Sequence, residues 1–202
     1  MIESVFEAYG EIYRNILNNI YPAKNSTGFP ERNLSVNFTK AYEAFAAQKG
    51  QNAFSWFEFQ FGNSNNLHVD AVLINKTTHE LYVIESKRFS NPMPKMREIG
   101  EDIDRVYSLV EELRQENLQD KFRIKLDDFE HKYGVILADV WTETPLKEEI
   151  LQAYKEGTLL DRYADEIKHE REIDPVSYYV QNFCDNVDVQ RYNLVSFMWE
   201  LR

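Results

Sequence analysis

The sequence has little of several residue types on which common folds and sites depend. It contains one cysteine, Cys184, seven glycines and six prolines among 202 residues. A single cysteine excludes an internal disulfide framework and a cysteine-rich zinc site, and it favours a reducing, cytoplasmic location. The few glycines form neither GxGxxG nor GxxxxGK, so the sequence offers no glycine-rich phosphate loop.

Long hydrophobic runs are also missing. No apolar stretch reaches the roughly 18 residues needed to cross a bilayer, so we expect no membrane-spanning segment. The first residues, MIESVFEAYGEIYRN, lack the basic start and the uninterrupted apolar block of a signal peptide. With 43% hydrophobic and 14% aromatic residues the chain can still bury a sizeable core, and its length suits a single domain over residues 1–202.

Positive charge is scarce. The chain has 23 Lys and Arg against 34 Asp and Glu, a net charge of −11, which excludes a protein that coats nucleic acid over a broad surface. Residues 31–97 hold eight Lys and Arg and six Asp and Glu, a charge of +2, so the remainder carries −13. A local basic rim near this segment can therefore hold DNA, whereas the acidic remainder suits a basic protein partner.

The most informative stretch is residues 67–89, LHVDAVLINKTTHELYVIESKRF, which predicts two strands joined by a polar turn. Both strands are almost continuously apolar, which is typical of strands covered on both faces. Asp70, Glu85 and Lys87 interrupt them, and a buried charge is costly unless it is paired or bound to a metal. Side chains two positions apart share a face, so Glu85 and Lys87 point the same way, and Asp70 can join them if the strands pair. Two carboxylates beside an ammonium group suit a hard divalent cation.

These residues resemble the PD-(D/E)XK nuclease superfamily, whose motif is an Asp, a hairpin and then Asp/Glu-x-Lys. Asp70 and Glu85-Ser86-Lys87 stand in that order, and the resemblance covers about residues 31–141. It implies a nuclease that uses Mg²⁺, or Mn²⁺, to hydrolyse phosphodiester bonds, with DNA as the expected substrate. Asp70, Glu85 and the main-chain carbonyl of Ser86 would hold the metal, and Lys87 would orient the attacking water. Many nucleases of this kind pair, so a homodimer is also implied.

A fourth acid, Glu31, precedes these strands. The superfamily's helical Glu often opens a pattern of Glu, two residues, an aliphatic residue and Ser or Thr, and residues 31–35, ERNLS, have that form. The resemblance therefore assigns Glu31 as a further catalytic acid. The alternative is that Glu31 only complements the positive start of its helix, and the sequence leaves both open.

The order of the predicted elements indicates the fold. Helices are predicted at 2–21 and 31–48, a strand at 54–61, the hairpin, a helix at 96–118, a short edge strand at 122–126 and a strand at 133–141. From residue 31 this order resembles the superfamily core, α-β-β-β-α-β, so we expect an α/β fold with a restriction-endonuclease-like mixed sheet flanked by helices. Residues 1–30 would add an N-terminal helix and loop. Residues 142–202 would add helices from Pro145, Thr158 and Pro175 and a last strand at 187–201.

Basic residues follow the Glu-x-Lys directly. Arg88, Lys95 and Arg97 lie in or beside a loop with two prolines, where they could hold a phosphate backbone. An ordinary surface loop is the alternative. The next helix carries several acids, among them Glu98 and Asp102, on what we expect to be a solvated face.

The sequence also allows two interpretations other than a nuclease. The chain could keep the nuclease fold as a catalytically silent module that binds a protein partner through its acidic surface. It could also be a plain α/β domain in which Glu85 and Lys87 form a structural ion pair.

Overall fold

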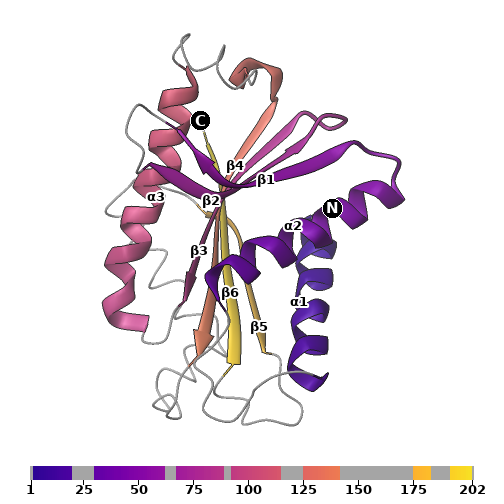
Figure 1. Ribbon diagram of the computed structural model, residues 1–202, viewed down its shortest axis with the longest axis vertical. Helices are drawn as coiled ribbons and strands as arrows, with labels where there is room; N and C mark the ends of the chain where they lie inside the picture. The colour runs from indigo at the N-terminus through magenta and orange to yellow at the C-terminus, as the bar shows by residue number, and fades with distance from the viewer. Residues whose placement is uncertain are drawn as a thin grey trace.

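The computed structural model shows an α/β fold in which three helices pack on a mixed β-sheet (Figure 1). It describes residues 2–19, 30–61, 67–88, 92–114, 125–141, 175–182 and 192–201. The elements in these ranges are, in chain order, α1 (Ile2–Asn19), α2 (Glu31–Gln48), β1 (Ala53–Gln60), β2 (His68–Asn75), β3 (Glu80–Arg88), α3 (Pro92–Arg114), the 3₁₀ turn η1 (Leu126–Asp128), β4 (His131–Trp141), β5 (Pro175–Asn182) and β6 (Tyr192–Glu200).

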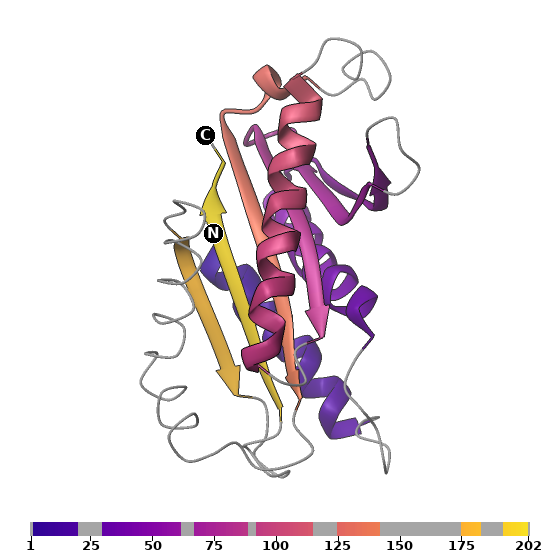
Figure 2. The same cartoon turned by 90° about the vertical axis from the view of Figure 1, so that its left-hand side faces the viewer.

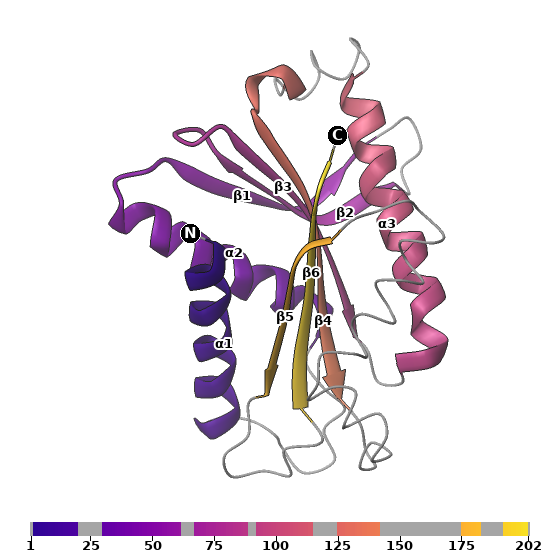
Figure 3. The same ribbon diagram turned by 180° about the vertical axis from the view of Figure 1, so that it is seen from behind.

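The sheet is the middle of three layers. Its strand order is β1-β2-β3-β4-β6-β5, with β3 and β4 parallel and every other neighbouring pair antiparallel. α3 covers one face, and α1 and α2 cover the other (Figure 2). β6 comes from near the end of the sequence but lies inside the sheet, between β4 and β5 (Figure 3).

Local sequence patterns explain why these elements form. In α1, apolar side chains recur every three or four positions, and Val5, Tyr9 and Tyr13 are buried on one stripe. The strands β2 and β3 are apolar throughout because both of their faces are covered. Val72 packs in the cluster under α3, and Leu73 packs in the cluster under α1 and α2. The prediction that this hairpin is covered on both faces is confirmed.

The order helix, three strands, helix, strand is confirmed for residues 31–141, but two local predictions are wrong. Pro175–Asn182 is a strand rather than a helix because its backbone pairs along β6. α3 begins at Pro92, four residues before the predicted start, so Lys95 lies in the helix with Arg97 and not in a loop. The edge strand predicted at 122–126 lies outside the described residues except for its end, where Leu126 opens the turn η1.

Other predictions for the C-terminal part have mixed outcomes. The last strand predicted at 187–201 is confirmed as β6, which the structure describes from Tyr192. The helices predicted from Pro145 and Thr158 lie outside the described residues. Among the helices that the structure describes, none is long and apolar enough to cross a bilayer.

Candidate active site

A kink in β1 and β2 shapes the candidate site. Glu58 in β1 has a φ of 51°, which is uncommon for a residue other than glycine. Phe57 packs in the cluster under α1 and α2, whereas Phe59 packs in the cluster under α3. Side chains two positions apart share a face in a regular strand, so the backbone must twist between Phe57 and Phe59 to place them on opposite faces. Asp70 lies at the matching step of β2, between Val69 and Ala71, which also pack on opposite faces.

Asp70 joins β2 to β3 through its side chain. The paired ladder of these strands ends at Ala71 and Ile84. Beyond this end of the ladder, the main-chain N–H of Ser86 donates a hydrogen bond of 2.6 Å to Oδ2 of Asp70. This bond fixes the Asp70 carboxylate beside the peptide that links Glu85 to Ser86.

Glu85 and Lys87 both face α3, as their spacing predicted. Glu85 is 3% exposed, and its Oε1 lies 2.8 Å from Nη1 of Arg105. The ammonium nitrogen of Lys87 lies 3.1 Å from Oδ2 of Asp102 and 3.7 Å from a carboxylate oxygen of Glu98. Glu85 and Lys87 are therefore each paired with a side chain of α3 and not with one another.

Glu31 reaches the same end of β3 from the other layer. It is the first residue of α2, and its Oε1 accepts a 2.8 Å hydrogen bond from the main-chain N–H of Arg88. It is close enough to act electrostatically on Asp70 and Lys87. The structure thus brings the four predicted catalytic side chains, Glu31, Asp70, Glu85 and Lys87, to one end of β3.

Burial and neighbouring charge raise the pKa of both central carboxyl groups. Burial raises the pKa of Glu85 to about 8, the nearby Asp70 carboxylate adds to the shift, and Arg105 opposes it. Burial also raises the pKa of Asp70, while the hydrogen bond from Ser86 opposes it and the charges of Glu58 and Glu31 add to it. Both shifts indicate two neighbouring carboxylates that one guanidinium only partly neutralises.

Asp102 and Arg105 were not among the predicted site residues. Asp102 was expected on a solvated face, which is wrong: it is 1% exposed and pairs with both Lys87 and Arg105, the latter at 3.2 Å. A signal for this was present, because Asp102 lies three residues after Ile99 and four before Val106, both buried on α3. A charged residue on the buried face of a helix indicates that it pairs with a charged residue of the element packed against that face.

The predicted phosphate-binding residues lie in different places. Arg88 ends β3 with its side chain half-buried, one position after Lys87 and therefore on the opposite face of the strand. Its register partner in β4 is Asp139. Lys95 and Arg97 lie in the first turns of α3, and their side chains fall outside the described part of the structure.

The donor chemistry fits a hard divalent cation. Within the described side chains, no three His, Cys, Asp or Glu residues are grouped to form a complete metal cage. Mg²⁺ does not require one, since proteins usually bind it through one or two carboxylates, waters and substrate phosphates. Asp70 and Glu85 supply two such carboxylates. In this conformation Arg105 holds Glu85, so a metal ion would have to replace the guanidinium there.

Comparison with known proteins found no relative of this chain. No family model, no curated protein and no solved structure matches it. The geometry of Asp70, Glu85, Lys87 and their neighbours is therefore the observation that indicates a function.

Proposed function

We propose that this protein is a Mg²⁺-dependent nuclease that hydrolyses phosphodiester bonds, with DNA as the expected substrate. The observation that carries the proposal is the 2.6 Å bond from Ser86 N–H to Asp70, which sets Asp70 beside Glu85-x-Lys87. The element order α2-β1-β2-β3-α3-β4 supports it, because it is the order that the resemblance to PD-(D/E)XK nucleases implies.

The chain's own residues supply positioning and charge for this reaction. Asp70, Glu85 and the carbonyl of Ser86 would hold Mg²⁺ or Mn²⁺, which supplies Lewis-acid activation of water and phosphate. The Lys87 ammonium would orient the attacking water and offset the negative charge that develops on the phosphoryl oxygens. Asp102, 3.1 Å away, keeps that ammonium charged and in place. Glu31 would act as the auxiliary acid at the edge of the site.

The test is a cleavage assay with several nucleic acids. Supercoiled plasmid, linear duplex, single-stranded DNA, a branched junction and RNA are incubated with the protein in Mg²⁺, in Mn²⁺ and in EDTA. We expect metal-dependent cleavage of at least one DNA substrate. Asp70→Asn and Lys87→Ala should each lower the rate by roughly 10²-fold or more, because each removes a charge that acts on the transition state.

The matched control is Lys40→Ala, which removes an exposed lysine from α2 without touching the site. It should cleave at the wild-type rate. Cleavage that persists undiminished in Lys87→Ala, or that continues in EDTA, would reject the proposal.

The second candidate is a catalytically silent module that binds a protein partner. The observation that favours it is that Glu85 and Lys87 are already held by Arg105 and Asp102. A calorimetric Mg²⁺ titration separates the two candidates. The nuclease proposal expects heat of binding that disappears in Asp70→Asn, whereas the silent module expects none in either protein.

A further inference from the structure

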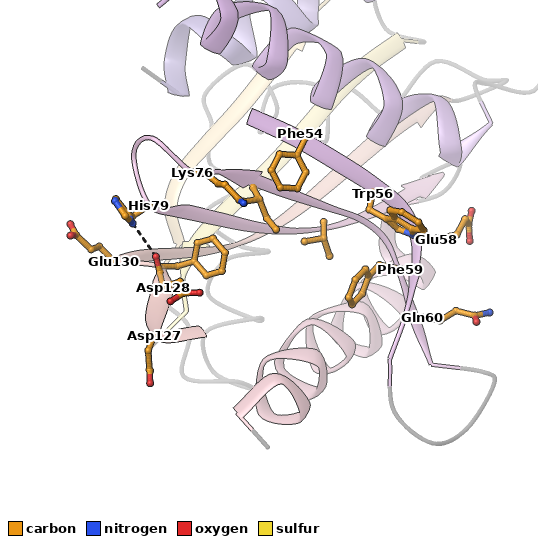
Figure 4. A pocket seen from close by; sticks show the side chains of 13 residues that line it. Phe54, Trp56, Glu58, Phe59, Gln60, Lys76, His79, Asp127, Asp128 and Glu130 are labelled. Carbon is orange, nitrogen blue, oxygen red and sulfur yellow. Dashed lines mark hydrogen bonds between the residues drawn. The ribbon is translucent and has the colours of Figure 1, made fainter. Parts of the chain in front are cut away.

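A groove lies on the face of the sheet away from α1 and α2, and it meets the surroundings of the candidate active site at Glu58. Its volume is about 1030 Å³. β1 and β2 form its floor, and the turn after β2 together with η1 forms one end (Figure 4). It involves none of the proposed metal-binding or catalytic residues, so an inference drawn from it does not depend on the proposed function.

The floor of the groove is aromatic and open. Phe54 is 42% exposed and Trp56 is 68% exposed, and they are the exposed large hydrophobic residues among the described side chains. They project from the same face of β1, two positions apart, and Val72 and Ile74 of β2 continue the apolar floor beside them. Two large aromatic rings exposed on the same face offer apolar contact area to a partner.

The rim of the groove is acidic. Figure 4 shows Asp127, Asp128 and Glu130 at one end of the groove and Glu58 at the other, with the aromatic rings between them. One lysine, Lys76, stands among the lining residues against these four carboxylates. The rim therefore carries a net negative charge, which repels the phosphates of a nucleic acid and attracts a cation.

The floor already holds an ammonium group. The Nζ atom of Lys76 lies 5.8 Å from the centroid of the Phe54 ring, within the range of a cation–π contact. Trp56 presents a larger ring that is more exposed and lies further from that lysine (Figure 4). Since Trp is the best aromatic partner for a cation, the groove offers a second place for a basic side chain.

β1 is the outermost strand of the described sheet on this side. An edge strand can pair with an extended segment of another chain, and its alternate side chains then meet alternate side chains of the guest. We propose that this groove binds an extended basic segment of another protein that pairs along β1. Alternate Arg or Lys side chains of the segment lie over the Trp56 ring and toward the acidic rim, and the side chains between them face away from the groove.

Binding is tested with defined peptides. The probe is an eight-residue peptide that alternates Arg and Val, and the comparison is the same peptide with Glu in place of Arg. Both lack tryptophan, so Trp56 emission reports binding, and Trp56→Phe identifies its contribution among the three tryptophans of the chain. We expect the Arg peptide to shift the emission to the blue and the Glu peptide to leave it unchanged.

Variants test whether the rim provides the affinity. The triple variant Asp127→Asn, Asp128→Asn, Glu130→Gln should bind the Arg peptide at least tenfold more weakly. The triple variant Glu3→Gln, Glu7→Gln, Glu11→Gln removes the same charge from the exposed side of α1 and should bind like the wild type. Lys76→Glu makes the rim more acidic and uncovers the Phe54 ring, so it should bind several-fold more tightly.

Four results would overturn the inference. The Arg peptide could fail to bind, or both triple variants could lose affinity equally, which would indicate an effect of net charge alone. Single-stranded DNA could bind in place of the peptide and be lost on Trp56→Ala. Sedimentation could also show a dimer that Trp56→Ala dissociates, which would make a second copy of this chain the occupant.

Discussion

Three acids of the candidate site are held by different kinds of partner. Asp70 accepts a main-chain N–H, Glu85 accepts a guanidinium, and Asp102 lies between a guanidinium and an ammonium group. A buried carboxylate without such a partner would be costly. The position of α3 on the sheet must therefore place Arg105 next to Glu85 of β3. The two elements are thereby fixed in register by charge as well as by apolar packing.

The first prediction concerns Asp102. Asp102→Asn leaves the size of the side chain unchanged but removes the charge that pairs with Lys87 and Arg105. Losing one partner of a buried pair leaves the other uncompensated, so we expect the free energy of unfolding to fall by about 2–4 kcal/mol. Urea denaturation measures it. Asp104→Asn, an exposed position on the same helix, is the control, and equal losses in the two variants would contradict the buried pair.

The second prediction concerns pH and Glu85. Its pKa is about 8 in the folded protein against 4.5 ordinarily, so the folded state holds the proton more tightly. The stability that this proton contributes is fully present below pH 4.5 and is lost as the pH rises through about 8. Glu85→Gln cannot lose a proton, so its stability relative to wild type should rise between pH 5 and pH 9. One pKa unit corresponds to about 1.4 kcal/mol, and we expect at least that change.

Urea denaturation at both pH values in EDTA measures this difference. A relative stability of Glu85→Gln that stays the same between pH 5 and pH 9 would mean that Arg105 keeps the carboxylate ionised throughout, and the prediction would be wrong.

Among the elements, those with a strong internal period could be predicted from the sequence, and those fixed by distant pairing could not. α1 and α2 repeat their apolar side chains at helical spacing, and β2 and β3 are apolar runs joined by a polar turn, so their type follows from local pattern. β5 is as long as β2, but its strand state comes from pairing with β6. Lys87 and Glu85 could be placed together by strand spacing. Arg105 could not, because its position depends on how α3 crosses the sheet.

The third prediction concerns the contact between β4 and β6. A Cβ added at Gly134 would lie 2.2 Å from the indole of Trp199, its register partner, which is 2% exposed. Gly134→Ala therefore forces a buried ring to move, and we expect the free energy of unfolding to fall by about 1–3 kcal/mol. Thermal or urea denaturation measures it.

A double variant provides the control for this contact. Adding Trp199→Leu removes the ring that would clash with the new methyl group. Gly134→Ala should therefore lower the free energy of unfolding by less in the Trp199→Leu variant than in the wild type. Equal losses in the free energy of unfolding in the two proteins would show that the contact with Trp199 is not what requires glycine at position 134.

At the scale of the whole molecule, β6 belongs to the core. Phe197, Trp199 and Leu201 pack in the cluster under α3, while Leu194 and Met198 pack in the cluster under α1 and α2. The alternation of residues 187–201 predicted a strand, but not its place beside β4. The position of β6 depends on which edge of the sheet is free after β3 and β4 have paired. The free edge is a property of the whole sheet and not of the sequence of β6.

The fourth prediction follows from that position. A chain that ends at residue 174 lacks β5 and β6, so it exposes the edge of β4 and uncovers part of both core clusters. We expect it to lose the cooperative urea transition and to aggregate, because an open apolar edge pairs with other chains. Size-exclusion chromatography and circular dichroism measure both effects. Co-expression with residues 175–202 should restore a soluble complex, since the missing strands can pair from a separate chain. A truncated chain that stays monomeric and unfolds at the wild-type urea midpoint would show that residues 2–141 form their own stable core.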